Sequence, residues 1–224
     1  MVKHLHREID GLKKMVLALG ARVEENVYKA VRSLEERDRE LAEEVIAADA
    51  EVDQEEVDIE EECLKVLALY QPVAGDLRMI VSILKINSDL ERVGDLSVNI
   101  AERALYLSTQ DRPNIPLDFT KMAEKTRRML RASLDALVNR DAGAAHEVMG
   151  ADDEVDAINR EMYVLIQEAI RKDPQKLESL IHLLSCSRHL ERIADHATNI
   201  AEEVIYMIEG EIVRHGRWDQ PDAE

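Results

Sequence analysis

Acidic side chains recur four residues apart in this sequence, within stretches that are otherwise rich in apolar residues. Two pairs lie in copies of one motif, LERVGDLSVNIAE (90–102) and LERIADHATNIAE (190–202), and two lie upstream in DAEVD (49–53) and DDEVD (152–156). The paired acids are Asp49/Asp53, Glu91/Asp95, Asp152/Asp156 and Glu191/Asp195. Residues four apart share one face of a helix, with Cβ atoms about 5–6 Å apart. Each pair can therefore present two carboxylates to a single ligand.

A cluster of such carboxylates requires a compensating positive charge or access to water. Asp49 and Asp152 fall on the apolar stripe of their predicted helices, where an unpaired charge is costly. Carboxylate oxygens are hard ligands that suit Mg²⁺, Ca²⁺, Mn²⁺ or iron, and they also bind Zn²⁺. We therefore predict two metal sites, one in each half of the chain. Salt bridges to Arg92 and Arg192, or simple solvation of the acids, remain the alternatives.

Several polar residues flank these acids and could serve as extra ligands or as hydrogen-bond partners of the ligands. They are Arg92, Asn99, Glu102, Arg192, His196, Asn199 and Glu202. His196 follows Asp195 directly, where the first copy of the motif has Leu96. Adjacent residues do not share a helix face, so an exposed histidine is the alternative to a ligand at this position.

The sequence offers little for catalysis. It contains no Glu-x-x-His, HExxH, GxSxG or Walker loop. Cys63 and Cys186 do not form a CxxC motif, and we expect both to be buried and reduced. These features predict a protein that is not an enzyme.

The composition favours a helical, water-exposed chain of acidic character. The 224 residues are 46% hydrophobic but only 3% aromatic, with 8 Gly and 5 Pro, a profile typical of helix rather than of β-sandwiches. The net charge of −18 disfavours nucleic acid and anionic lipid as partners. The start lacks the apolar region of a signal peptide, and the longest apolar stretch is too short to span a bilayer. We therefore predict a cytoplasmic protein without direct membrane insertion.

Internal duplication organises the chain into two halves. Periodicity predicts helices up to the polar break at 37–40, from about 41 to 70, and from 76 to about 106, with Asp76 as the N-cap of the third. The second half repeats the plan at about 117–139, 143–171 and 175–209. The fold class is therefore all-α, as two tandem antiparallel three-helix bundles. The predicted divisions are a first bundle (1–107), a linker (108–116), a second bundle (117–210) and a polar tail (211–224).

The hairpin geometry brings the two motifs of each half to the same level. Asp53 lies 20 residues before Val73, at the centre of the predicted turn, and Glu91 lies 18 residues after it. In the second half, Asp156 and Glu191 lie 18 before and 17 after Pro174. Helices that leave such a turn antiparallel should therefore bring four carboxylates together in each half.

The duplicated motifs, with DAEVD and DDEVD upstream and LYQPVAGDLRMIVSILKI (69–86) around the first turn, resemble the PhoU family of phosphate-uptake regulators. The resemblance covers about residues 5–210. It implies two similar three-helix bundles, a homodimer, and iron or other metal clusters held by the paired acids named above.

It also implies a function: linking the ATPase of a phosphate ABC transporter to a PhoR-type sensor kinase and repressing phosphate-starvation genes when phosphate is ample. The residues alone leave open a helical scaffold or dimerisation protein whose acids are structural or solvated. The turn RKDPQKLES of the second half departs from QPVAGDLR of the first, so a partner surface there would be asymmetric.

Overall fold

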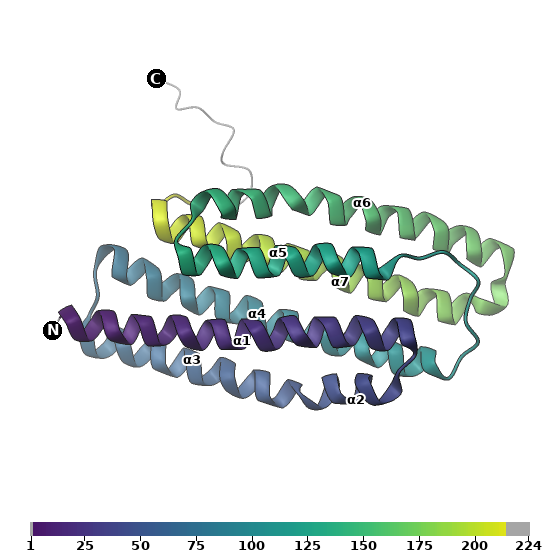
Figure 1. Cartoon of the computed structure of the whole chain (residues 1–224), viewed down its shortest axis with the longest axis horizontal. Coiled ribbons are helices and arrows are strands. Elements are labelled where there is room, and N and C mark those ends of the chain that lie inside the picture. The colour runs from purple at the N-terminus through teal and green to yellow at the C-terminus, as the bar shows by residue number, and fades with distance from the viewer. Residues whose placement is uncertain (1, 214–224) are drawn as a thin grey trace, which may run out of the picture.

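Long helices form the whole of the ordered architecture within residues 2–213, which the computed structural model describes (Figure 1). The first half comprises α1 (Val2–Glu36), α2 (Arg39–Ala47), α3 (Asp49–Tyr70) and α4 (Ala74–Ser108). The second comprises α5 (Phe119–Asn139), α6 (Ala142–Lys172), a short 3₁₀ turn η1 (Pro174–Lys176) and α7 (Leu177–Glu209). At 1.5 Å per residue, the longest helices, α1 and α4 with 35 residues each, extend about 50 Å. The all-α, duplicated plan expected from the sequence is confirmed.

The two halves lie side by side, and α4 and α7 form the most extensive contact between any two helices (Figure 1). Lys85 of α4 faces Glu203 of α7, while Tyr106 stacks on His182 with ring centroids 4.1 Å apart. Because the number in one helix rises as the other falls, α4 and α7 run antiparallel. Equivalent helices of the duplicated halves therefore meet about an approximate two-fold axis.

A single apolar core runs through both halves. The stripe predicted for 41–70 is buried at Val45, Val52, Ile59, Cys63 and Val66. Both cysteines are free and buried, as predicted. Burial raises the pKa of each thiol, which keeps the sulfur atoms uncharged at neutral pH.

Two details of the predicted elements are wrong. The expected helix from 41 to 70 is interrupted at Ala48, where the Glu51 amide bonds to the Ala48 carbonyl at 3.2 Å in a tight i→i+3 turn. The equivalent helix α6 is continuous. Asp76 does not cap α4, because the helix begins two residues earlier, after the extended residue Val73. Asp76 instead occupies the first turn and faces His6 at 3.8 Å.

Two further expectations concern the membrane and the tail. None of the helices between residues 2 and 213 combines the length and the apolar character needed to cross a bilayer. Most of the predicted polar tail, residues 214–224, lies outside the described residues.

Candidate metal centres

The first acid cluster lies between α3 and α4, on the outer side of the first half. Burial raises the pKa of Asp49, and the charges of Asp53 and Asp95 raise it further. The pKa of Glu91 is raised by burial, then by Asp95, with contributions from residues of α3. Acids from the two helices therefore act on one another, as the hairpin geometry predicted. The pKa values of Asp49 and Glu91 are raised mainly by burial and secondly by neighbouring acids, while Arg92 lowers that of Glu91.

Glu56 adds a fifth acid to this cluster, beyond the four predicted from the sequence. Its pKa is raised by burial and by the charges of Glu60 and Asp53. The Asn87 amide donates to its carboxylate at 3.0 Å and to its backbone carbonyl at 2.9 Å. The sequence contained a signal that Glu56 belongs to the cluster, because Glu56 lies on the apolar stripe seven residues after Asp49. The equivalent residue of the second half is Asn159, so the two clusters differ in charge.

The second cluster lies between α6 and α7 and carries the largest shift among the eight predicted acids. Burial raises the pKa of Asp152 to about 6, and the charges of Asp195 and Asp156 come next among the causes. One carboxylate oxygen of Asp152, Oδ1, is buried and has no hydrogen-bond partner within the described structure. The pKa values of Glu191 and Asp195 are raised as well, first by burial and then by neighbouring acids. A buried oxygen aimed among like charges is suited to a cation.

Arginines neutralise part of each cluster. Arg92 lies 3.3 Å from Glu91 and 3.0 Å from Asp95, so the salt-bridge alternative is realised at the edge of the first cluster. In the second cluster, Asp156 pairs with Arg160 one turn along α6, at 3.3 Å. Arg192 acts on Glu191 and Asp195 by charge. All three arginines are exposed, so solvent weakens these pairs.

Two of the remaining flanking residues contact neighbours on their own helix. Asn99 donates to the backbone carbonyl of Asp95 at 2.8 Å, and Glu102 pairs with Arg103 at 2.9 Å. Glu202 is half-buried further along α7.

His196 and Asn199 point toward the other half of the molecule. The Nδ1 atom of His196 lies 2.8 Å from Asp89 Oδ1 on α4, and the Asn199 amide donates to the same oxygen at 3.3 Å. The duplicated counterpart of the His196–Asp89 pair is Leu96 with His189. Leucine cannot accept a hydrogen bond, which fits the burial of both His189 ring nitrogens without a partner in the described structure.

As the side chains stand, no group of three His, Cys, Asp or Glu within residues 2–213 is close enough to enclose a metal ion. The fit of these residues to a metal therefore depends on their carboxylate oxygens and on the buried Asp152 Oδ1, which has no hydrogen-bond partner in the described structure.

Gly94 lets α3 and α4 approach one another between the acids. A Cβ atom at this position would lie 3.1 Å from Cγ1 of Val52, the residue that directly precedes Asp53. We predict that Gly94→Leu forces the helices apart, destabilises the fold by about 1–3 kcal/mol and weakens metal binding at the first cluster. Thermal melting and metal titration would measure both effects.

Gly11→Leu is the matched control, because a Cβ atom at Gly11 of α1 meets nothing within 4 Å. Both substitutions raise helix propensity by a similar amount, so their difference isolates the packing between α3 and α4. Equal stability of the two variants would contradict the close-approach role of Gly94.

Fold and clusters together define a class: an all-helical protein built from two copies of one module, each with a cluster of acids between the two helices of a hairpin. The chain belongs to the PhoU family, since the PhoU domain matches it twice, at residues 16–104 and 119–204.

Relatives with known names cover most of the chain. It is 42% identical over 213 residues to a "Phosphate-specific transport system accessory protein PhoU homolog" of Aquifex aeolicus, covering 94% of this chain and 96% of that one. It is 36% identical to the Pseudomonas aeruginosa homologue over 95% of this chain and 88% of the other.

Two solved structures of PhoU proteins have the same fold as this chain. The crystal structure of PhoU from Pseudomonas aeruginosa superposes with a TM-score of 0.89 at 35% identity, covering 92% of this chain and 99% of that one. The phosphate transport system regulatory protein PhoU from Streptococcus pneumoniae gives 0.83 at 32% identity, covering 93% and 99%.

Proposed function

We propose that this protein is a cytoplasmic regulator of phosphate uptake and of phosphate-starvation signalling. It acts as an adaptor between the ATPase of a phosphate ABC transporter and a PhoR-type sensor kinase, and it represses phosphate-starvation genes when phosphate is ample. Membership of the PhoU family and the accessory role in phosphate transport named for its relatives support this proposal. The role depends on protein contacts and includes no catalytic step.

Exposed apolar side chains at the end of the first hairpin support a role in docking. Val73 in the turn is 76% exposed, Leu69 at the end of α3 is 67% exposed, and Leu77 of α4 lies beside them. Apolar side chains grouped in this way are characteristic of interaction sites. A second exposed set, Tyr163, Val164, Leu177 and Ile181 on α6 and α7, offers a surface for the homodimer that belongs to the same proposal.

Metal binding at the two acid clusters is the second element of the proposal. The observation that carries it is the partnerless Oδ1 of Asp152, buried among acids that raise its pKa. The donor set is carboxylate oxygen, so the residues fit hard or borderline cations: iron, Mn²⁺, Mg²⁺, Ca²⁺ or Zn²⁺. A bound cation would supply the positive charge that these acids lack and would fix the relative positions of α6 and α7.

A scaffold role without functional metal is the competing proposal. The pairing of Arg92 with Glu91 and Asp95 favours it, because arginine already offsets part of the charge in the first cluster. The two proposals differ in what removal of metal does to the protein.

We expect bound metal to depend on the paired acids. Asp53→Asn/Glu91→Gln should remove the metal of the first cluster and Asp152→Asn/Glu191→Gln that of the second, as measured by elemental analysis of the purified protein. Glu124→Gln/Asp135→Asn on α5 is the control, because it removes two exposed acids and changes the net charge equally. Unchanged metal content in either cluster variant would exclude that cluster. A chelator that leaves melting temperature and oligomeric state unchanged would favour the scaffold.

The adaptor role is tested in phosphate-fed cells by co-purification of the transporter ATPase and the sensor kinase with the tagged protein. Loss of the protein should switch on phosphate-starvation genes in ample phosphate. The two cluster variants, tested alongside, show whether metal binding is needed for these contacts.

A further inference from the structure

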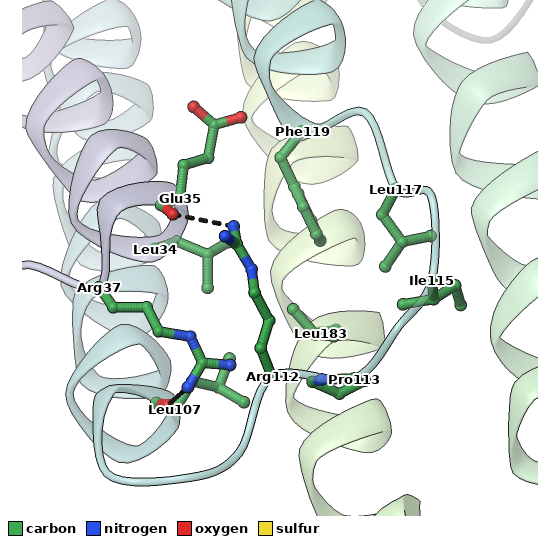
Figure 2. Close-up of a pocket in the computed structure, with 10 residues that line it drawn as sticks. All are labelled: Leu34, Glu35, Arg37, Leu107, Arg112, Pro113, Ile115, Leu117, Phe119 and Leu183. Carbon is green, nitrogen blue, oxygen red and sulfur yellow. Dashed lines mark hydrogen bonds between the residues drawn. The ribbon is translucent and has the colours of Figure 1, made fainter. Parts of the chain in front are cut away.

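A cavity of about 300 Å³ lies where the two halves are joined. Figure 2 shows the linker closing one side of it, with α1 and α4 of the first half and α7 of the second forming the others. Six apolar side chains provide most of the wall: Leu34, Leu107, Ile115, Leu117, Phe119 and Leu183. Both halves and the linker thus contribute to one cavity.

Two guanidinium groups face this cavity, from Arg37 and Arg112 (Figure 2). Arg37 Nη1 donates to the backbone carbonyls of Leu107 and Gln110 at the end of α4. Arg112 Nη2 donates to the Glu35 carbonyl at the end of α1, at 3.0 Å. Carbonyl groups at helix C-termini attract cations, and these bonds fix both side chains. Each guanidinium carries five N–H donors, so most donors on each group are left for a ligand.

The positive charge of the two arginines is only partly offset by neighbouring acids. Within residues 2–213, neither guanidinium forms an ion pair with a carboxylate. Burial and the charge of Arg112 lower the pKa of Arg37, while the charge of Asp111 acts in the opposite direction. The Glu35 carboxylate accepts a hydrogen bond from Thr120 and points away from the guanidinium groups (Figure 2). Asp111 lies nearby but pairs with Lys176 at 3.2 Å.

Basic residues continue around the linker. A second cavity of about 340 Å³ shares Arg112, Pro113 and Ile115 with the first, and its lining adds Lys172 and Lys176 together with the acids Glu168 and Asp173. Two arginines that face one cavity are unexpected on a chain with a net charge of −18. The first cavity, with Arg37 and Arg112, is therefore the place at this end of the molecule where an anion would be attracted.

We propose that the cavity binds a phosphate dianion between Arg37 and Arg112, with the apolar wall contacting the organic part of a phosphomonoester. The paired N–H donors of an arginine guanidinium match the spacing of phosphate oxygens. A doubly charged phosphate can neutralise both guanidinium groups, whereas a single carboxylate neutralises only one guanidinium group. The phosphate is either free inorganic phosphate or the headgroup of an ester. The site shares no residue with the acid clusters, so it stands or falls independently of metal binding.

Calorimetric titration of the full chain, freed of metal on a chelating resin, tests the proposal with two probes, inorganic phosphate and phenyl phosphate. We expect binding of at least one probe, and Arg112→Gln should weaken it at least about tenfold. Arg131→Gln, at an exposed position of α5, is the matched charge control and should bind as the wild type does. Tighter binding of phenyl phosphate identifies an ester as the ligand class, and tighter binding of inorganic phosphate identifies the free anion.

Leu183→Trp provides a second variant that fills the cavity and leaves both arginines in place, and it too should weaken binding. Circular dichroism identifies any variant that fails to fold. The proposal is overturned if the folded wild type binds neither probe at about 10 mM. It is equally overturned if folded Arg112→Gln and Leu183→Trp both bind as tightly as the wild type, because binding would then occur elsewhere.

Discussion

Replacing Asp152 with asparagine should make the metal-free protein more stable at pH 7.5. The pKa of Asp152 is raised to about 6, first by burial and then by Asp195, Asp156 and other acids. A carboxyl group whose pKa is higher in the folded than in the unfolded state favours folding when protonated and opposes it when charged. A shift of about two units corresponds to about 3 kcal/mol, which solvent screening reduces to roughly 1–2 kcal/mol. The melting temperature should rise by about 3–6 °C.

The pH dependence of this stability difference shows whether the charge of Asp152 causes it. The advantage of Asp152→Asn should be full above about pH 7, decline as pH falls below about 6, and disappear only below about pH 3.8, where the wild-type carboxyl is protonated in both states. Thermal melts between pH 4.5 and 8 in a chelator would measure it, with Asp135→Asn on the exposed face of α5 as control. An advantage that persists unchanged at pH 4.5, or that Asp135→Asn reproduces, would refute this account.

Metal should reverse the order of stability. A ligand that binds only the folded state stabilises it in proportion to the logarithm of its concentration over Kd. Wild type should therefore gain more than Asp152→Asn from added Mn²⁺ or iron. The same carboxylate would lower stability in the empty protein and raise it in the loaded one.

Replacing Lys85 with methionine should destabilise the contact between the two halves. Lys85 Nζ lies 3.0 Å and 3.1 Å from the two carboxylate oxygens of Glu203 and 5.3 Å from the centre of the Tyr206 ring. Glu203 is only 4% exposed, so removal of the ammonium group takes away the charge that faces it across α4 and α7. Breaking a buried pair in this way costs about 3–5 kcal/mol. Because Lys85 itself is partly exposed, we expect about 2–4 kcal/mol, or roughly 5–15 °C in melting temperature.

Two comparisons isolate the effect of burial. Lys65→Met removes the lysine of an exposed Lys–Glu pair, with Glu62 at 2.8 Å, and should change the melting temperature little. The double variant Lys85→Met/Glu203→Leu should recover much of the loss, because apolar residues often replace a buried ion pair at no cost. If Lys85→Met costs no more than Lys65→Met, the pair does not contribute to the packing of α4 against α7.

The sequence predicted what depends on periodicity and distance along the chain. The acids of α3 and α4 meet because the hairpin places Asp53 and Glu91 at one level, which can be counted from residue numbers. The break at Ala48 could not be predicted, because no Gly or Pro marks it. The contact of His196 with Asp89 depends on how the halves pack against each other, and duplication gives no sign of it, since the counterpart of Asp89 is His189.

The cavity at the linker was missed for a related reason. Arg37 lies in the polar break after α1 and Arg112 in the linker, 75 residues apart, and neither position belongs to a recognisable motif. Only the folded chain shows that both guanidinium groups contact helix ends that meet at the same place.

The linker, residues 109–118, makes the pairing of the two modules an intramolecular event. In a dimer of single modules, the pairing of helices like α4 and α7 would depend on protein concentration, and each substitution would appear on both sides of the axis. Here the tether fixes an effective concentration that reaches the millimolar range for short connections. The two halves of one chain therefore always pair with each other, and they can differ in sequence. Each acid cluster can change by mutation without altering the other.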